Sequence, residues 1–449
     1  MLNRNWIALT AVFLALGINA LMANVELVKP TFITSYRGHY EKHIAPQLHQ
    51  LDWQNHELVA KKLVDKDEVF PKTIELIESA KKQIFFGSYL FGGKIGDDIL
   101  AALKKKQDQG VNVFLVLSKT SQSYDKAKLK EQEIFDELHE AEKAGNPVIK
   151  SPYMQKMSKA KAMGIPTVHA ETKFIDAWVP VRVDHSKILV IDGVEAIFGG
   201  MNYADTTSKN HDTMVHVAGP FVQELEKNFA NNWICGWAKE HPRLLYTEED
   251  ALAKMEELYK DPSYKKSTSR FTVTAPFARN TREELIRLFD EAKHSILVEN
   301  LLFNDTKVLK AVARAAQRGV KIRLLLDPAE HLYYRDWRGG PNNKAVAVIQ
   351  KIQEKHPELD VEARFYKVGP GAELHMKICI VDDKTLGIGS TNFTSGAFQS
   401  NYEMFAFMEG GIVEEYLDLF WNDWKNHSKE APKVNLGRKI ISIISDWIF

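Results

Sequence analysis

The sequence predicts an α/β fold made of two pseudo-symmetric domains, each a mixed β-sheet flanked by helices. Its 449 residues are 45% hydrophobic and 26% charged, which is typical of a globular chain long enough for two domains. Apolar runs alternate with amphipathic helical stretches, as in sheets covered by helices. The same order of segments occurs twice along the chain, so the fold is expected to repeat one plan.

A strand–helix–strand unit opens each half. AKKQIFF from Ala80 and AKHSILV from Ala292 each lead into an apolar strand. Amphipathic helices follow, ending at Gly110 and Gly319, where glycine suits a helix C-terminus. The apolar runs VNVFLVLS and VKIRLLLD come next, so each unit is predicted to contribute two parallel strands.

A longer segment is also repeated, and it carries the polar residues. VDHSKILVIDGVEAIFGGMNYAD aligns with ELHMKICIVDDKTLGIGSTNFTS. His185 and His375 are 190 positions apart, and so are Asn202 and Asn392. Amphipathic helices, VQELEKNFANNWI and VEEYLDLFWNDW, then close the halves in nearly the same register. Such a long register indicates a duplicated domain.

The repeated pattern is His-x-Lys-x4-Asp-x6-Gly-[Gly/Ser]-x-Asn. Its two copies are His185, Lys187, Asp192, Gly199, Gly200, Asn202 and His375, Lys377, Asp382, Gly389, Ser390, Asn392. A histidine and a lysine two positions apart on a strand point to the same face. If the halves pack symmetrically, two histidines, two lysines and two asparagines converge, a set that suits a phosphoryl group.

Carboxylates occur at matching places after the histidines. A catalytic imidazole needs its second nitrogen held by a partner, commonly a carboxylate. Asp212 lies 27 residues after His185 and Glu403 lies 28 after His375, so each is matched with the histidine of its own half. The motif residues beside turns, and the small residues after the glycines, are given supporting roles: Asp192, Asp382, Gly200 and Ser390.

Charge and composition argue against several classes of protein. Lys+Arg and Asp+Glu are both 59, whereas a general nucleic-acid binder usually has a basic excess. The two cysteines are too few for a disulfide framework, and no Cys/His cluster has zinc spacing. We therefore expect no structural metal and no obligatory nucleic-acid partner.

The N-terminal residues 1–23 are typical of a signal peptide. Arg4 is followed by an uncharged, apolar-leaning run from Trp6 to Ala23. An uncleaved membrane anchor is the alternative, since this length is the lower limit for spanning a bilayer. Either interpretation predicts an exported protein, periplasmic or secreted and possibly membrane-associated.

The predicted organisation therefore has five parts: 1–23 as signal peptide or anchor, 24–240 as first domain, 241–270 as linker, 271–425 as second domain and 426–449 as an amphipathic C-terminal tail. In that tail Leu436, Ile440, Ile443, Ile444 and Trp447 share one helical face, beside Arg438 and Lys439. The face suits a membrane interface or docking on the protein's own core, and the pattern does not separate the two.

The two motifs resemble the duplicated HKD motifs of the phospholipase D superfamily, over roughly residues 70–425. The resemblance implies two α/β domains around a pseudo-twofold axis and phosphodiester chemistry without a cofactor or metal. It implies that His185 attacks phosphorus to form a phosphohistidine intermediate and that His375 protonates the leaving alcohol. It further implies that Lys187, Lys377, Asn202 and Asn392 hold the phosphate, and that Asp212 and Glu403 orient the histidines.

The leading functional hypothesis is a phospholipase D-like phosphoric diester hydrolase that acts on phospholipids at a membrane surface, as a monomer. Two alternatives share the same histidine chemistry. One is a cardiolipin synthase-like transphosphatidylase, which differs in its acceptor. The other is a secreted HKD nuclease acting on DNA or RNA.

Overall fold

The structure is a computed structural model, and it describes residues 55–118, 159–168, 183–235, 242–275, 278–332, 336–399 and 401–445. All of these residues belong to one compact unit. Residues 1–23, for which the sequence suggests a signal peptide or anchor, lie outside the described part. Within the described ranges, no helix is both long enough and apolar enough to cross a membrane.

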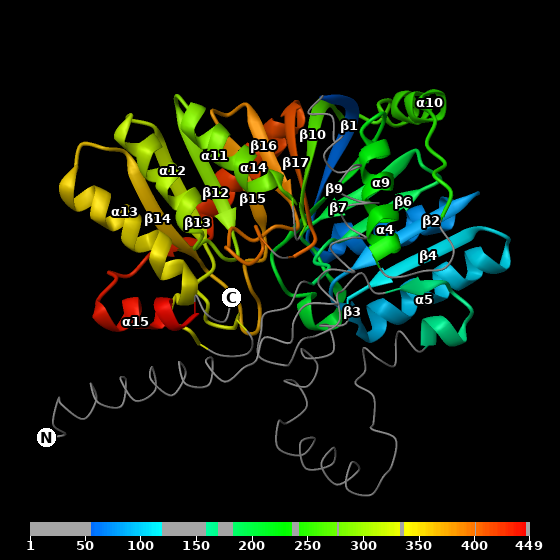
Figure 1. The fold of residues 1–449 in the computed structure, drawn as a ribbon, viewed down its shortest axis with the longest axis horizontal. Helices are drawn as coiled ribbons and strands as arrows, with labels where there is room; N and C mark the ends of the chain where they lie inside the picture. The colour runs from blue at the N-terminus through cyan, green and yellow to red at the C-terminus, as the bar shows by residue number, and fades with distance from the viewer. Residues whose placement is uncertain are drawn as a thin grey trace, which may run out of the picture. The chain divides into compact units, whose positions relative to one another are not determined.

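One mixed sheet runs through both halves of the chain (Figure 1). In the first half its strands are β1 (His56–Val64), β2 (Gln83–Ser88), β4 (Asn112–Leu117), β5 (Thr167–Val168), β6 (Ile188–Ile191), β7 (Glu195–Gly199) and β9 (Thr213–Ala218). In the second half they are β10 (Lys265–Ala275), β12 (Ser295–Asn300), β13 (Lys321–Leu326), β14 (Val361–Tyr366), β15 (Lys377–Val381), β16 (Thr385–Gly389), β17 (Glu403–Gly410) and β18 (Ser428–Glu430). The short strands are β3 (Phe91–Gly92) and β8 (Tyr203–Ala204), which pair with each other, and β11 (Ala278–Arg279), which pairs with β10.

The strand order is the same in both directions from the centre of the sheet. It reads β1-β9-β7-β6-β2-β4-β5 on one side and β10-β17-β16-β15-β12-β13-β14 on the other. Strands β1 and β10 join the halves as an antiparallel pair, with Leu58 opposite Ser267. The predicted parallel pairs are present as β2 with β4 and β12 with β13. The predicted fold class is therefore confirmed.

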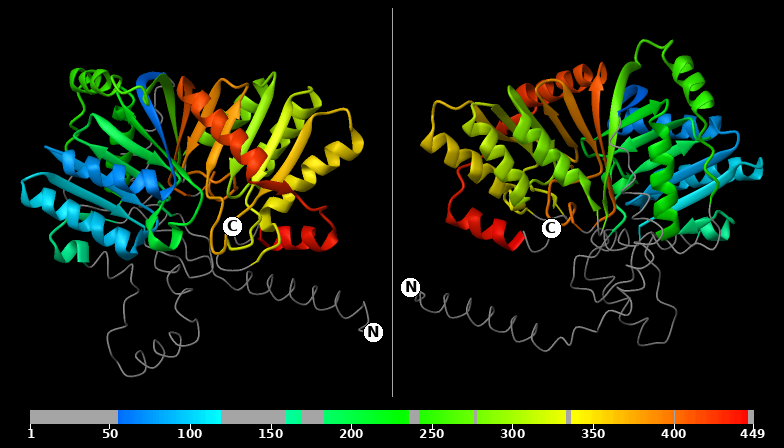
Figure 2. Two further views of the ribbon diagram at one scale, coloured as in Figure 1. Left: turned by 180° about the vertical axis from the view of Figure 1, so that it is seen from behind. Right: turned by 45° about the horizontal axis from the view of Figure 1, so that its top comes forward.

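Helices cover both faces of this sheet (Figure 2). In the first half they are α4 (Asp65–Ser79), α5 (Gly93–Asp108), α9 (Val222–Cys235), α10 (Glu248–Leu258) and the 3-10 turn η2 (Asp205–Thr207). In the second half they are α11 (Asn280–Glu291), α12 (Thr306–Gln317), α13 (Asn343–Lys355), α14 (Ile412–Asn426), α15 (Leu436–Ser445) and the turn η4 (Gly340–Asn342). Figure 1 shows α9, α11, α12 and α13 in front of the sheet, and the view from behind in Figure 2 shows α4, α5 and α14 on the far side. On β1 itself, α14 and α4 lie on opposite faces, because Lys62 contacts Glu415 of α14 whereas Leu63 packs in the core with α4.

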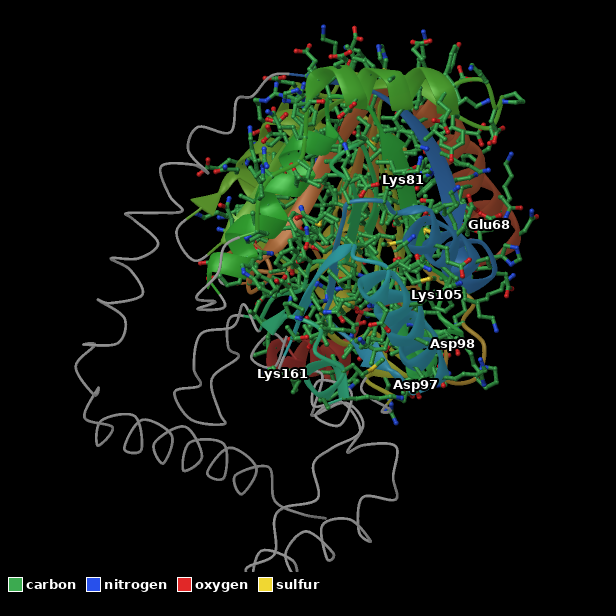
Figure 3. All side chains as sticks on the ribbon, turned by 90° about the vertical axis from the view of Figure 1, so that its right-hand side faces the viewer. Glu68, Lys81, Asp97, Asp98, Lys105 and Lys161 are labelled. Carbon is green, nitrogen blue, oxygen red and sulfur yellow. The ribbon has the colours of Figure 1, made fainter. Side chains whose placement is uncertain are left out.

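Each half has its own apolar core between sheet and helices. Helix α5 buries Ile99 and Leu103 against the first core and exposes Asp98 and Lys105 on the outside, where Figure 3 shows them. This spacing is that of an amphipathic helix. The second core contains the equivalent apolar faces of α11, α12 and α13. The site between the halves therefore rests on two separately packed supports.

Two ranges outside the predicted domains contain regular structure. The range 241–270, suggested by the sequence as a linker, holds α10 and the first residues of β10. The range 426–449, suggested as a tail, holds β18 and α15. The side chains of Ile444 and Trp447 lie outside the described part of that tail.

The motif aspartates hold the chain where it enters a central strand. The carboxylate of Asp192 accepts the backbone N–H groups of residues 81–83, at 2.7 to 2.8 Å. Asp382 accepts those of residues 293–295, at 2.7 to 3.1 Å. Both aspartates have positive φ angles, 53° and 55°, which allow the carboxylate to turn back on the neighbouring strand's entry. Their role is to fix the starts of β2 and β12.

Replacing Asp192 by alanine is expected to lower the free energy of unfolding by about 1–3 kcal/mol, because three N–H groups lose their acceptor. Urea unfolding followed by circular dichroism measures the change. Glu256→Ala is the matched control: Glu256 is exposed and lies 3.9 Å from Lys266, so its loss should cost at most about 0.5 kcal/mol. Equal losses for the two variants would contradict the role given to Asp192.

Candidate active site

The two motif histidines occupy equivalent positions just before strands of the two halves. His185 precedes β6 and His375 precedes β15, and their exposed fractions are only 7% and 6%. The lysine two positions later is buried in each copy, and its Nζ donates to the carbonyl oxygen of its own histidine. For Lys187 that distance is 2.5 Å. Each histidine and lysine therefore form one local unit.

Backbone bridges between the halves hold both units in place. The N–H of His185 donates to the carbonyl of Tyr402 at 2.9 Å, and the Tyr402 N–H donates to Val183. Correspondingly, the N–H of His375 donates to the carbonyl of His211 at 2.8 Å. Each catalytic segment is therefore fastened to the residue that immediately precedes the carboxylate of the other half.

This arrangement exchanges the two carboxylates, which corrects the pairing expected from the sequence. Glu403 of the second half lies 3.0 Å from His185 Nδ1. Asp212 of the first half lies 2.6 Å from His375 Nδ1. The physical reason is the backbone bridging, since a residue next to the bridge can only reach the histidine across it. The spacing of 27 and 28 residues indicated the correct carboxylates but not their partners.

The residue after the motif glycine, Gly200 or Ser390, has a size that suits the carboxylate beside it. A Cβ on Gly200 would lie 2.3 Å from Asp212 Oδ1, so only glycine leaves room for the shorter carboxylate there. Ser390 stands at the equivalent position, and its hydroxyl donates to Glu403 Oε2 at 2.5 Å. The supporting residues therefore differ between the halves because the carboxylates differ in length.

The partners of the two imidazoles select different tautomers. His185 Nδ1 faces two acceptors, Glu403 and the carbonyl of Ser390 at 3.0 Å, so Nδ1 carries the proton and Nε2 is free to attack. Burial lowers the pKa of His185, with Glu403 opposing, which keeps this imidazole neutral. A neutral ring with an unprotonated Nε2 is the form that a nucleophile requires.

His375 has the opposite surroundings. Its Nδ1 faces the ammonium of Lys377 at 3.0 Å and the carboxyl of Asp212. Burial raises the pKa of Asp212 to about 7, so this pair keeps an extra proton up to neutral pH. Burial, together with Lys377 and Lys187, lowers the pKa of His375 itself, which places that proton on the Asp212 side of Nδ1. Nε2 is then the protonated nitrogen, as a general acid requires.

Two buried lysines give the site its positive charge. Burial lowers the pKa of Lys377 to about 8 and that of Lys187 well below its usual range, although neighbouring carboxylates oppose the shift. An anion bound between the two lysines stabilises their charged forms. Such a pair suits a phosphodiester, whose negative charge grows in the transition state.

The motif asparagines add amide groups beside the lysines. Asn202 Oδ1 accepts the N–H of Leu90 at 3.1 Å, while its buried Nδ2 has no partner among the described residues. Asn392 likewise has an unpartnered side-chain atom, Oδ1. Buried amides normally hydrogen bond, and Asn202 Nδ2 can donate to a phosphoryl oxygen. Asn392 Oδ1 is an acceptor, so that amide donates to an anion only when it is turned to present Nδ2.

Two aromatic or charged neighbours were not found from the sequence. The Tyr89 ring lies edge-on to His185, with centroids 4.7 Å apart, and Lys187 Nζ lies 5.1 Å from its centre. His211 hydrogen bonds to Asp65 at 3.0 Å and to Asp423 at 2.9 Å. The sequence could have pointed to these two residues only by their positions. Tyr89 directly follows a predicted strand, and His211 directly precedes Asp212, a predicted orienting carboxylate.

His211, Glu299 and Asp423 form the group in the described ranges that could hold a metal ion. Their ligand atoms lie within 4.8 Å of one another. Although burial lowers it, the pKa of His211 is raised to about 10 by the bonds to Asp423 and Asp65. Burial raises the pKa of Glu299 well above its usual range. A protonated histidine and a neutral acid already balance this cluster, so it serves as a tie between the halves.

Comparison with known proteins places this site in a family. The family described as "Cardiolipin synthase, PLD-like domain" matches residues 73–233 and 285–424. Cardiolipin synthase A of Pseudomonas fluorescens is 24% identical over 408 residues, covering 85% of this chain and 74% of its own length. Cardiolipin synthase 1 of Bacillus anthracis is 24% identical over 387 residues, covering 82% and 67%.

A solved structure supports the fold independently. Phosphatidylserine synthase of Haemophilus influenzae Rd KW20 superimposes with a TM-score of 0.60 at 13% identity, covering 91% of this chain and 96% of that one. The two matched segments each contain one copy of the His-Lys motif. The chain therefore belongs to the phospholipase D superfamily, as a two-repeat member of the cardiolipin synthase, PLD-like domain family.

Proposed function

We propose that this protein is a phosphatidyl transferase of the cardiolipin synthase type, which moves a phosphatidyl group from one phospholipid to the hydroxyl of another. The convergence of two histidines with two buried lysines supports the phosphodiester chemistry. Transfer to an alcohol is supported by the relatives, which are named cardiolipin synthases and which match most of this chain. These relatives favour the transferase alternative over the leading hypothesis of hydrolysis.

The first half of the reaction begins at His185. Its unprotonated Nε2 attacks phosphorus, forming an N–P bond while the P–O bond to the headgroup alcohol breaks. His375 gives its Nε2 proton to the leaving oxygen, and the proton held with Asp212 remains on Nδ1. Lys187 and Lys377, with the amides of Asn202 and Asn392, stabilise the charge on the phosphoryl oxygens.

The second half reverses these roles. His375 Nε2, now unprotonated, takes the proton from the acceptor hydroxyl as its oxygen attacks phosphorus. The N–P bond breaks, and the phosphatidyl group is transferred while His185 returns to its neutral form. Water in place of the alcohol gives phosphatidic acid, so the same residues could support hydrolysis. The acceptor that reaches the site decides the product.

The enzyme is expected to meet its substrate at a membrane, because both substrate and acceptor are phospholipids. Export to the periplasm or the outside of the cell remains part of the proposal, as suggested by residues 1–23. Activity as a monomer is also proposed, since both histidines and both carboxylates come from one chain.

Product analysis tests the proposed reaction. Phosphatidylglycerol vesicles incubated with the purified protein should yield cardiolipin and free glycerol, because one phosphatidyl group is transferred to a second lipid. Mass spectrometry identifies the lipids, and plasmid DNA is incubated in parallel. His185→Asn, which keeps the fold but lacks the attacking nitrogen, is the control and should form no product.

Phosphatidic acid as the sole lipid product would contradict transfer and favour the hydrolase. Nicked DNA with unchanged lipid would contradict both and favour the nuclease.

The rate constant kcat/KM is expected to fall as the pH rises through about 7 to 8. The first loss follows the Asp212 carboxyl, whose ionisation moves the remaining proton of His375 to Nδ1 and leaves Nε2 without one. The second follows Lys377, which becomes neutral near pH 8. Initial rates from pH 5.5 to 9.5 measure the profile.

Near-ultraviolet circular dichroism at each pH checks that the fold is intact. A rate that stays constant or increases between pH 7 and 9 would contradict the acid role of the His375–Asp212 pair.

A further inference from the structure

Helix α15 turns an apolar face away from the protein. Among the described residues five large hydrophobic side chains are exposed: Leu244, Tyr259, Leu436, Ile440 and Ile443. The last three belong to this one helix of ten residues, and their exposed fractions are 74%, 49% and 60%. They are spaced i, i+4 and i+7, so they form a single stripe.

The face of α15 that contacts the protein is largely polar. The guanidinium of Arg438 donates to the carbonyl of Arg338, and the Asn343 amide donates to the Arg438 carbonyl at 3.5 Å. Ser442, one turn later, is buried at 6% exposure, and Ile441 beside it is half-buried. A helix of a globular protein normally turns its apolar stripe to the core. Helix α15 does the reverse.

The elements on which α15 packs are hydrogen bonded to the segment that precedes His375. The helix packs on α13 and on η4, beside the lower edge of the sheet in Figures 1 and 2. From η4, the Asn342 amide donates to the carbonyls of Leu301 and Asp327, both at 2.8 Å. The Asp327 carboxylate in turn accepts the N–H of Leu374, which precedes His375, at 2.7 Å. These hydrogen bonds therefore hold the exposed stripe of α15 at a fixed position relative to the catalytic site.

Charge around the stripe indicates what covers it. The sequence from 431 to 445 contains Lys433, Arg438 and Lys439 but no aspartate or glutamate. The side chain of Lys433 is 85% exposed, with its Nζ 3.5 Å from the carboxylate of Glu354. Within α15 itself the charged residues are the cations Arg438 and Lys439. An apolar stripe on a helix whose charged residues are cations suits the surface of an anionic phospholipid membrane, where the side chains enter the acyl region and the cations meet the headgroups.

We propose that α15 lies in the interface of an anionic phospholipid membrane, with Leu436, Ile440 and Ile443 inserted, and thereby orients the catalytic site toward that surface. The orienting role rests on the proposed function, in which membrane lipids are the substrates. The membrane contact itself rests only on the exposed stripe and its charges.

Spin labels on the full-length protein test the membrane contact. Ile440→Cys carries a nitroxide on the stripe, and Tyr259→Cys, at an exposed hydrophobic position on another element, is the matched control. The unsubstituted protein is labelled in parallel as a blank for the native cysteines. On phosphatidylglycerol vesicles, the label at 440 should gain access to oxygen and lose access to a water-soluble nickel complex. The label at 259 should not change.

A label at 440 that remains open to the nickel complex would overturn the proposal. So would protection of that label without vesicles in a protein that light scattering shows to be a dimer, because a second copy would then cover the stripe.

A second variant tests the link to catalysis. Leu436→Ser/Ile440→Ser/Ile443→Ser removes the stripe at exposed positions, and Leu244→Ser/Tyr259→Ser is its control. Loss of inserted apolar area should lower turnover on vesicles by roughly 100-fold and leave turnover of monomeric short-chain phosphatidylglycerol unchanged. Equal turnover on vesicles would overturn the orienting role. Absence of turnover on either substrate by the unsubstituted protein would overturn the proposed function, while the spin-label result would still decide the membrane contact.

Discussion

The backbone bridges between the two halves are the constraint on which the site depends. The segment before β6 is fastened beside β17, and the segment before β15 is fastened beside β9. Because each bridge ends one residue before a carboxylate, each histidine is oriented by the opposite half. A half on its own would hold a histidine without its carboxylate. Duplication in this fold therefore gives one shared site and not two separate ones.

The backbones of the two halves are nearly symmetric, but their two histidines have different surroundings and different protonation forms. His185 meets acceptors only at Nδ1, whereas His375 meets an ammonium and a carboxyl group that burial keeps protonated to about pH 7. The two rings therefore start in the two forms that phosphoryl transfer needs, one able to attack and one able to give a proton. The two sides also differ in their carboxylates, since glutamate stands with serine on one side and aspartate with glycine on the other.

Burial of these charged groups is costly unless each has a partner. The lysines are held by the carbonyls of their own histidines and by the field of Glu403 and Asp212. Their lowered pKa values mean that a bound phosphodiester restores the charge that the empty site disfavours. Binding energy is thereby directed to the groups that stabilise the transition state. The cluster of His211, next to Asp212 in the sequence, contributes the same kind of balance.

Much of this structure follows from local patterns in the sequence. The apolar runs after His185 and His375 predicted the strands, and the spacing of each lysine two residues after its histidine predicted the shared face. The turn chemistry of Asp192 and Asp382 predicted a supporting place, which the contacts with the backbone now explain.

Other features depend on contacts between distant segments and have no local signal. The exchange of Asp212 and Glu403 is decided by bridges to residues roughly 200 positions away. The partners of His211 come from α4 and α14, which nothing in its neighbourhood indicates. The orientation of α15 was open for a similar reason, because an amphipathic pattern does not reveal which face the protein contacts.

Nuclear magnetic resonance of the histidine rings tests the exchanged pairing most directly. In protein labelled with ¹⁵N histidine, Glu403→Gln should shift the ring signals of His185 and leave those of His375 nearly unchanged, whereas Asp212→Asn should do the reverse. His185→Asn and His375→Asn assign the signals. A shift of the His185 signals in Asp212→Asn, with none in Glu403→Gln, would show that each half orients its own histidine and would contradict this account of the site.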